Sequence, residues 1–344
     1  MAVQTPDEVT KRIDELKGER VPADLSETLI DRLKRIQEGQ VPFNELERQL
    51  EYIDWVVSLP WEDRTKDILD LPHTKEVLNT SHYGLASIKE RILEYIAIMQ
   101  LRASTSGHPR APLLCFVGLV GTGKTTMAAS IANALGRTFV RIPLGGLGEV
   151  ATLRGTPRFE TSAEPGAIIK SLKRAKAKNP VILLDEIDRV AEAARASVMG
   201  ALVEILDPEQ NSHFIDAYID YPFDLSEIFF IASANNTTNI ATAVLDRLEI
   251  VEMPSYTDEE KMAIGRDFIL PRILDESGVS RDALTLSPTV WPLIVRPLGY
   301  DAGMRTLERT IQAIVRKVAK EIVEGKTKSV QINETTLEEY VSMW

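Results

Sequence analysis

Short apolar runs alternate with amphipathic segments through the middle of the chain. Between about residues 112 and 254 the runs are PLLCFV, TFVRIPL, PVILLDE, IFFIASAN and LEIVEMP, and helical patterns lie between them. Apolar runs of this length are typical of strands buried on both faces, and intervening helices are typical of parallel strands joined by crossovers. The pattern therefore predicts an α/β domain in which a parallel sheet is flanked by helices.

Residues 1–60 have a helical pattern instead. The first amphipathic segment begins with a capping box at Thr5. The second is LSETLIDRLKRIQEG, which ends near Gly39, and the third runs from about Asn44 to Pro60. Three short charged helices bury little apolar surface by themselves. We expect this three-helix module to lean on another part of the protein.

A boundary is predicted near residue 254, where MPSYTDEEK combines a proline with a capping box at Thr257 and Glu260. The segments EEKMAIGRDFILPRIL and AGMRTLERTIQAIVRKVAKEIVEG then have helical patterns. The second can end at Gly325, and its apolar face is formed by Leu307, Ile311, Val315, Val318 and Ile322. The chain is thus expected to have three parts: the helical module at 1–60, the α/β domain at 61–254 and a mostly helical domain at 255–344.

Composition narrows the function classes. The 344 residues include 40 basic and 51 acidic side chains, a formal net charge of −11, so generic nucleic-acid binding is not expected. The basic run KSLKRAKAKN, residues 170–179, is interpreted as a solvated helix face. No apolar run approaches the roughly 20 residues that a membrane span needs. The single cysteine, Cys115, is expected to be a buried thiol, and the acidic N-terminal segment favours a cytoplasmic setting.

The stretch GLVGTGKTT combines glycines, a lysine and hydroxyls between an apolar strand and an amphipathic helix. Glycines allow backbone N–H groups to approach phosphates, and a helix N-terminus favours their negative charge. Lys124 would reach the β- and γ-phosphates of ATP, and Thr125 would ligate Mg²⁺. The residues predicted to bind ATP are Gly118, Leu119, Val120, Gly121, Thr122, Gly123, Lys124, Thr125 and Thr126.

Polar side chains end two further strands of the predicted sheet. VILLDEIDR ends in Asp185 and Glu186, and IFFIASAN ends in Asn235. A carboxylate beside a phosphate loop can hold Mg²⁺, and a second one can orient and polarise an attacking water. We therefore assign Asp185 to Mg²⁺, Glu186 to the water and Asn235 to the water or the γ-phosphate.

Two arginines follow these motifs at positions that favour a catalytic role. Arg247 lies in VLDRLE and Arg305 in AGMRTLER. A lone arginine is more often part of a surface ion pair. The transition state of phosphoryl transfer, however, is strongly stabilised by an arginine delivered from outside the pocket. Their order after the phosphate loop and the acidic pair makes both arginines catalytic candidates.

At this point the sequence resembles the AAA+ module of the Lon family of ATP-dependent proteases. The similarity covers essentially the whole chain, in the family's order and spacing, and LDPEQN is a more specific signature than any phosphate loop. The segments that carry it are YIDWVVSLPW, HYGLASIKERILEYIA, LGRTFVRIPLGGLGEVATLRG, NPVILLDEIDR, LVEILDPEQNSHFIDAYID, DLSEIFFIASAN, VLDRLEIVEMPSYTDEEK and AGMRTLER.

The resemblance implies a role for each matching residue. Tyr83 and Gly84 would line the adenine pocket. Asp185 and Glu186 would be the Walker B pair. Asn235 would be the first sensor and Arg305 the second sensor. Arg247 would be a finger that reaches a neighbouring subunit's nucleotide. A hexameric ring of identical subunits is implied as well. ATP hydrolysis in such a ring would unfold polypeptide substrates and translocate them for degradation.

The chain departs from the family in two respects. No segment matches the family's proteolytic domain with its serine–lysine dyad, and we expect the chain to be a fragment of a longer Lon-type protein, with a natural protease-less ATPase as the alternative. The second departure lies in GTPRFETSAEPGAIIK, where the family has a tyrosine and an aliphatic residue that grip substrate. Here Glu160 and Thr161 take those places and Phe159 lies one position earlier. Either Phe159 replaces the grip, or threading is impaired or specialised.

The expected function is therefore that of an ATP-hydrolysing motor module without a proteolytic site of its own. Two other interpretations remain open: a chaperone-like remodeller that acts alone or with a separate peptidase, and an ATP-gated scaffold with little turnover. The intact catalytic set favours turnover over the scaffold, while the altered loop favours the scaffold slightly. Nothing in the sequence identifies the polypeptide substrates.

Overall fold

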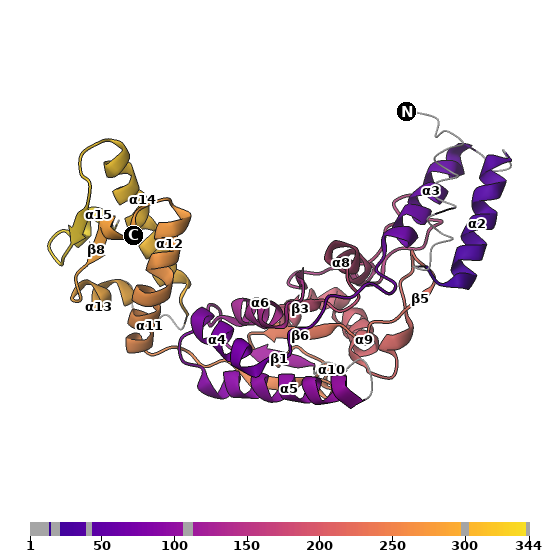
Figure 1. Cartoon of the computed structure of the whole chain (residues 1–344), viewed down its shortest axis with the longest axis horizontal. Coiled ribbons are helices and arrows are strands. Elements are labelled where there is room, and N and C mark those ends of the chain that lie inside the picture. The colour runs from indigo at the N-terminus through magenta and orange to yellow at the C-terminus, as the bar shows by residue number, and fades with distance from the viewer. Residues whose placement is uncertain (1–13, 15–20, 39–42, 106–112, 297–302, 342–344) are drawn as a thin grey trace.

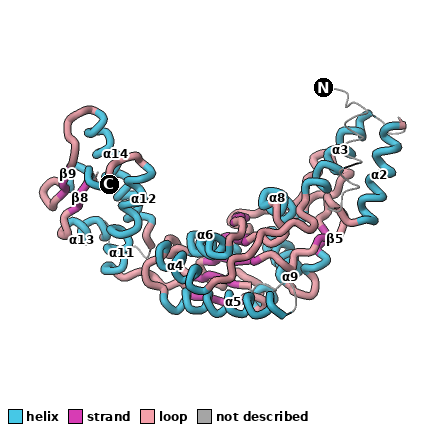
Figure 2. The backbone as a smooth tube through the Cα atoms, viewed as in Figure 1, coloured by secondary structure: helices cyan, strands magenta, loops and turns pink. Residues whose placement is uncertain are grey.

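The structure, a computed structural model, describes residue 14 and residues 21–38, 43–105, 113–296 and 303–341. These residues form an open crescent (Figures 1 and 2). A pair of N-terminal helices forms one arm, a C-terminal helical part forms the other, and the sheet with its covering helices lies between them. Among the described residues no helix has the length and apolar character that crossing a membrane requires.

The central sheet confirms the predicted α/β class. Its five strands lie in the order β2-β3-β6-β1-β7 and all pair in parallel. Each strand coincides with one of the five apolar runs: β1 (Leu114–Val117), β2 (Phe139–Pro143), β3 (Val181–Asp185), β6 (Phe229–Ala234) and β7 (Glu249–Glu252). Because the strands are parallel, the residues that follow β1, β3 and β6 meet at one edge of the sheet.

Alternate residues of each strand belong to two different cores. Leu183 and Ile231 face a core built with α4 (Leu71–Ser81), α5 (Ala86–Thr105) and α6 (Lys124–Leu135). Ile182 and Phe230 face a second core built with α8 (Ala167–Ala175) and α9 (Arg195–Leu206). Strict alternation of this kind follows from the period of two in a strand and explains why the runs are apolar throughout.

The N-terminal helices share the second core with the sheet. These helices are α2 (Ala23–Gln37) and α3 (Phe43–Ser58), which match the second and third predicted helices. Leu29, Leu33 and Ile53 are fully buried within the same cluster as the strand residues. The expectation that this module leans on another part is thereby met for α2 and α3. The first predicted helix, beginning at Thr5, lies outside the described residues.

The C-terminal part is helical with one small sheet. It contains α11 (Asp258–Ile264), a π-helical turn (Gly265–Ile269), α12 (Leu270–Glu276), α13 (Val290–Val295), α14 (Arg305–Val323) and α15 (Leu337–Tyr340). The capping box at Thr257 and Glu260 is present, and α14 ends before Gly325 as predicted. A parallel pair of strands, β8 (Leu284–Leu286) and β9 (Val330–Ile332), has no counterpart in the sequence prediction.

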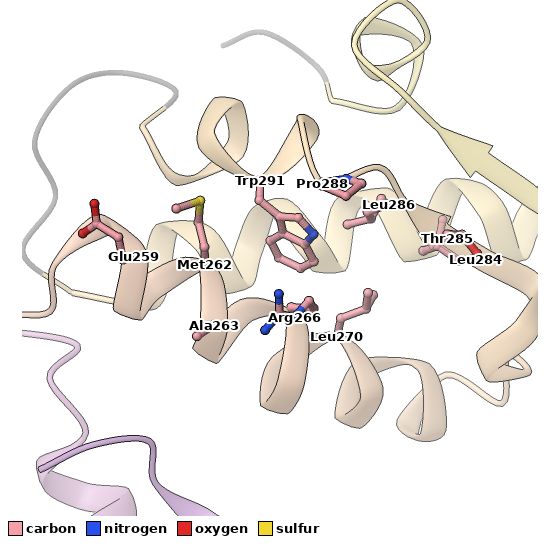
Figure 3. A pocket seen from close by; sticks show the side chains of 10 residues that line it. All are labelled: Glu259, Met262, Ala263, Arg266, Leu270, Leu284, Thr285, Leu286, Pro288 and Trp291. Atoms are coloured by element: carbon pink, nitrogen blue, oxygen red, sulfur yellow. The ribbon is translucent and has the colours of Figure 1, made fainter. Parts of the chain in front are cut away.

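A cavity of about 430 Å³ lies within this part (Figure 3). The ring of Trp291 and the side chain of Leu270 point into it. Gly265 makes the close packing possible, because a Cβ there would lie 2.7 Å from the Trp291 ring.

The short elements of the remaining chain are α7 (Ala151–Arg154), β4 (Phe214–Ile215), β5 (Pro222–Phe223) and α10 (Thr242–Leu245).

Candidate nucleotide site

A cavity of about 660 Å³ lies where the carboxyl ends of β1, β3 and β6 meet the C-terminal part. This edge is where open α/β sheets bind ligands. The predicted residues that line the cavity are Tyr83, Val120, Gly121, Gly123, Lys124, Thr125, Thr126, Asp185, Glu186, Asn235 and Arg305. Of the residues predicted for ATP binding or catalysis, those outside the lining are Gly84, Gly118, Leu119, Thr122 and Arg247.

The loop between β1 and α6 is shaped by glycines. Gly121 and Gly123 have φ values of 83° and 96°, a region that residues with side chains rarely adopt. The following helix begins at Lys124, and the N–H groups of a helix's first turn have no acceptors within the helix. The loop therefore presents free backbone donors and a helix N-terminus to one wall of the cavity, an arrangement suited to phosphate groups.

Lys124 is folded back onto its own loop. Its Nζ donates to the carbonyl oxygens of Gly118 at 2.5 Å and Leu119 at 3.0 Å, and to Oδ1 of Asn235 at 3.3 Å. Burial lowers the pKa of Lys124, while the nearby carboxylates of Asp185 and Asp188 act in the opposite direction. A phosphate is a charged acceptor and therefore a stronger partner than these neutral oxygens. Lys124 is thus placed to exchange them for a nucleotide.

Hydroxyl groups follow Lys124 at the start of α6. Thr126 donates to the Gly123 carbonyl at 2.9 Å, and its Oγ1 lies 3.0 Å from Nε2 of His82. Within the described part of the chain, the Thr125 hydroxyl has no hydrogen bond to protein and is available to a metal ion. His82 is buried, and its burial followed by the charge of Lys89 lowers its pKa to about 4, so the ring is neutral near pH 7.

Both oxygens of Asp185 already have partners. Ser233 donates its hydroxyl to Oδ1, and Arg141 on the neighbouring strand β2 contacts Oδ2 through Nε and Nη2, each at 2.6 Å. Asp185 is only 4% exposed. These contacts hold the carboxylate in one orientation at the end of β3. A metal ion at Asp185 would therefore share it with the Arg141 guanidinium.

Glu186 has an unusual backbone conformation. Its φ of 59° and ψ of 47° lie in the left-handed region, which costs energy for a residue with a side chain. The Ser233 hydroxyl accepts a hydrogen bond from the Glu186 N–H at 3.0 Å, which helps to hold this conformation. Gly145 lies so close that a Cβ there would be 2.5 Å from Oε2 of Glu186. The backbone is thereby held where the Glu186 side chain lines the cavity, and Nη1 of Arg189 lies 3.5 Å from its Oε1.

Asn235 is held from two sides. Its backbone N–H and its Nδ2 donate to Oδ2 of Asp188, at 3.1 and 3.4 Å, while its Oδ1 accepts from Lys124. Asp188 is 5% exposed, and its other oxygen, Oδ1, has no partner among the described residues. Asp188 was not predicted as a site residue, although it lies three positions after Asp185 in the same DEID stretch.

The C-terminal part closes the cavity. Met304 donates its N–H to the Gly121 carbonyl at 3.1 Å, so the segment before α14 contacts the glycine loop directly. Arg305, the first residue of α14, lines the cavity. Tyr83 and Phe268 line the same cavity and make an edge contact, with the two ring centroids 6.4 Å apart. The predicted adenine-side residue Tyr83 and the predicted sensor Arg305 therefore share one cavity.

Arg247 lies away from this cavity and is bound to the LDPEQN turn. Its Nη2 and Nε donate to Oδ2 of Asp207 at 2.6 and 3.1 Å, and its Nη1 donates to the Ala243 carbonyl at 2.7 Å. Asp207 also accepts from the backbone N–H of Glu209 and from the side chain of Gln210. The turn thus orients the guanidinium, and Arg247 does not reach its own subunit's cavity.

The predicted substrate-gripping residues lie at the tip of a separate loop, residues 156–166. Phe159 is 83% exposed, and Glu160 and Thr161 are exposed beside it. An aromatic ring is thus exposed at the loop tip, one position before Glu160, and both the replaced grip and the impaired or specialised threading stay predictions.

The basic run at residues 170–179 is not simply a solvated face. Nζ of Lys173 lies 3.8 Å from the centre of the Trp55 ring, and Lys170 pairs with Glu164 at 2.8 Å. Lys178 is buried and lies 3.3 Å from Glu227. The prediction of a solvated helix face was wrong for Lys173 and Lys178, because these positions bind partners that are distant in sequence.

Two family models match the chain. The model of the ATPase family associated with various cellular activities (AAA) matches residues 114–256, which include the sheet and the nucleotide cavity's glycine loop. The model of the Lon protease AAA+ ATPase lid domain matches residues 275–330.

Relatives agree with these matches. The Lon protease of Dictyoglomus thermophilum is 43% identical over 92% of this chain and 42% of its own length. The Lon protease of Lawsonia intracellularis is 40% identical over 99% of this chain and 41% of its own length. The Lon protease of Bacillus thuringiensis is 45% identical over 82% of this chain and 35% of its own length. The chain thus spans about two fifths of the length of these curated relatives. Because the AAA and Lon lid models both match this chain and these relatives align over most of its sequence, the chain is an AAA+ ATPase module of the Lon protease family.

Proposed function

We propose that this chain hydrolyses ATP and uses the energy to unfold polypeptide substrates and move them towards a protease domain, in the same protein or in a separate subunit. The observation that carries the proposal is the gathering of Lys124, Glu186, Asn235 and Arg305 around one cavity of nucleotide size. The cavity also contains a helix N-terminus for the phosphates and an aromatic wall at Tyr83.

Each residue has a proposed task. Lys124 binds the β- and γ-phosphates, Glu186 polarises the attacking water, and Asn235 positions that water or the γ-phosphate. Thr125 and Asp185 would hold Mg²⁺, which supplies charge neutralisation to the phosphates. The donor set fits, since one hydroxyl is free and one carboxylate is rigidly oriented. No cluster of three or more His, Cys, Asp or Glu among the described residues could hold a metal alone, so the nucleotide would supply further ligands.

We further propose that Arg247 completes the site of a neighbouring copy. Arg247 is oriented by Asp207 but lies outside the cavity of its own chain. An arginine supplied by a neighbour is an effective way to stabilise the charge of the transition state. A closed ring of identical chains, as in the proposed hexamer, gives every site such a neighbour. The division into parts at 1–60, 61–254 and 255–344 and the cytoplasmic location remain predictions.

The first test measures ATP turnover per chain across a range of protein concentrations. Turnover should rise with concentration as the sites are completed, and Arg247→Ala should lower it about a thousandfold. Arg281→Ala is a matched control, because Arg281 makes a similar two-pronged ion pair with Asp275 at an exposed place in the lid. Flat, negligible turnover with ATP still bound would contradict the motor function and favour the scaffold.

Mixing two inactive variants tests the neighbour's role separately. Glu186→Gln chains lack the base but keep Arg247, and Arg247→Ala chains keep the base. A mixed ring contains some sites with an intact Glu186 beside an intact Arg247, so mixing should restore part of the turnover. If Arg247 acted on its own chain's nucleotide, no mixed site would be complete and mixing would restore nothing.

A further inference from the structure

The loop that carries Phe159 is closed at its base. The N–H of Thr156 donates to the Glu164 carbonyl at 3.0 Å, and the N–H of Glu164 donates to Oγ1 of Thr156 at 2.8 Å. Just beyond, the N–H of Gly166 donates to Oδ2 of Asp216 at 2.7 Å. The loop therefore leaves the protein and returns through a narrow stem that is tied to the segment around residue 216.

Asp216 anchors that segment. It is 1% exposed, and its Oδ1 accepts from the backbone N–H groups of Tyr218 and Ile219, at 2.9 and 3.1 Å. Asp216 thus joins the return side of the loop to residues 216–220. Buried carboxylates are costly unless they are fully hydrogen-bonded, so this arrangement specifies one geometry.

Arg158 ties the outgoing side of the loop to the same place. Its guanidinium carbon lies 4.1 Å from the centre of the Tyr52 ring, and its Nη2 lies 3.3 Å from Oδ2 of Asp220. Tyr52 belongs to α3 of the N-terminal helices, and its hydroxyl donates to the Ile219 carbonyl at 2.9 Å. The Tyr52 ring is therefore in contact both with the loop and with the segment that anchors the loop.

Tyr52 is itself held firmly by its surroundings. It is 4% exposed and belongs to the core that α2 and α3 share with the sheet. A guanidinium over a buried aromatic ring is attracted by the ring's electrons and gains more when water is excluded. Arg158 is only 28% exposed, so the contact is largely shielded from solvent.

We propose that Arg158 and Tyr52 form a brace through which the N-terminal helices position the Phe159 tip for substrate. Arg158 is the residue immediately before Phe159, so a shift of Arg158 displaces the aromatic ring that meets the polypeptide. The proposal rests on the proposed function in that Phe159 contacts substrate. It adds a task for the N-terminal helices, which otherwise would only complete the core. Arg158 is a positioning residue and does not touch substrate itself.

The brace can be measured without any ATP turnover. The single native thiol, Cys115, is fully buried, and burial raises its pKa to about 12, so it should not react. Thr161→Cys at the exposed tip then offers one site for a nitroxide spin label. The label should be restricted in the otherwise unchanged chain and clearly more mobile with Arg158→Ala. The midpoint of thermal unfolding should stay within a few degrees in both.

Arg32 provides the matched control. Its guanidinium carbon lies 5.8 Å from the centre of the same Tyr52 ring, but Arg32 lies on α2 and not on the loop. Arg32→Ala should leave the label's mobility unchanged. Tyr52→Phe keeps the ring and removes only the hydroxyl, so it should fall between the starting protein and Arg158→Ala. Equal mobility in Arg158→Ala and Arg32→Ala would overturn the brace.

A second readout connects the brace to substrate. The probe is a reduced, carboxymethylated and fluorescently labelled protein, and the measured quantity is the concentration that gives half-maximal binding with a slowly hydrolysed ATP analogue present. Arg158→Ala should raise this concentration by up to about fivefold, because a tip released from the brace lies in the substrate-ready position for only part of the time. An unchanged value together with a more mobile label would refute the positioning role. If Phe159→Ala also left binding unchanged, the proposed substrate contact itself would be wrong.

Discussion

The nucleotide cavity and the 156–166 loop are held in opposite ways. In the cavity the reactive groups themselves have partners: Lys124 donates to loop carbonyls, and Asp185 is paired with Arg141. In the loop the stem is held by Arg158 and Asp216, whereas the tip at Phe159 is exposed. In the proposed function, the cavity would exchange these partners for a nucleotide. The loop would keep its support while its exposed tip contacts polypeptide.

The largest expected difference between the two regions comes from Glu186→Gln. The amide cannot accept a proton from water, so ATP turnover should fall by about a hundredfold to a thousandfold. Glutamine has the same shape as glutamate, so the affinity for a fluorescent ATP analogue should stay within about twofold. The affinity of the loop for the unfolded protein probe should also stay within about twofold. Turnover and nucleotide affinity are measured on the same preparation. Unchanged turnover would remove Glu186 from its assigned task.

His82 gives the region around the cavity a pH dependence below neutral pH. Burial and Lys89 lower its pKa to about 4, against 6.5 in an exposed histidine. Below pH 6.5 His82 binds a proton in the unfolded chain but stays neutral in the folded chain, so the free energy of unfolding should fall as pH drops from 6.5 towards 4. Near pH 4 this decrease in the free energy of unfolding reaches about 3 kcal/mol, and above pH 7 His82 causes no decrease.

Denaturant unfolding at pH 7.5 and 5.0 measures the difference in the free energy of unfolding between the two pH values. His82→Gln should reduce the difference between the two pH values, because glutamine does not titrate. His73→Gln is the control, since His73 is not buried and lies in the first turn of α4, the helix that ends just before His82. If both variants kept the full difference, other groups would be responsible for the acid sensitivity.

At the loop, Phe159→Ala should weaken binding of the unfolded protein probe about tenfold, because an aromatic anchor is removed from the centre of the contact. Phe159→Tyr, which keeps an aromatic ring one position before the place of the family's tyrosine, should stay within about twofold of the starting protein. The half-maximal concentration measured by fluorescence anisotropy distinguishes the two. Equal weakening by both would show that the tip does not act through its ring.

The smallest effect is expected at Glu160. An exposed carboxylate beside the ring should favour basic unfolded segments over acidic ones by a fewfold, and salt should weaken the preference. Glu160→Gln should reduce the ratio of affinities for a lysine-rich and a glutamate-rich probe by about threefold at low salt. Glu164→Gln is a control of the same charge, since Glu164 already pairs with Lys170. A ratio that did not change would leave Glu160 without a role in selection.

The same contrast explains what the sequence could predict. The five strands, the glycine loop and the residues that end β3 and β6 follow from local patterns, because apolar runs and adjacent motif residues act over a few positions. The partners of those residues do not. Arg141 meets Asp185 and Arg158 meets Tyr52 only after strands and helices distant in sequence have come together. The pair β8 and β9 was missed for this reason too, since three-residue strands carry too little periodicity.

The parallel pairing of β8 with β9 has a consequence for synthesis on the ribosome. Leu284–Leu286 can find its partner strand only after α14 and then Val330–Ile332 have left the exit tunnel. The lid core contains residues from both sides of this pair, so it condenses late. Until then Met304 and Arg305 have no fixed support, and the glycine loop faces water. If the proposed function holds, a nascent chain would not bind its nucleotide tightly when the sheet alone is complete, and ATP hydrolysis would begin only after the lid has formed.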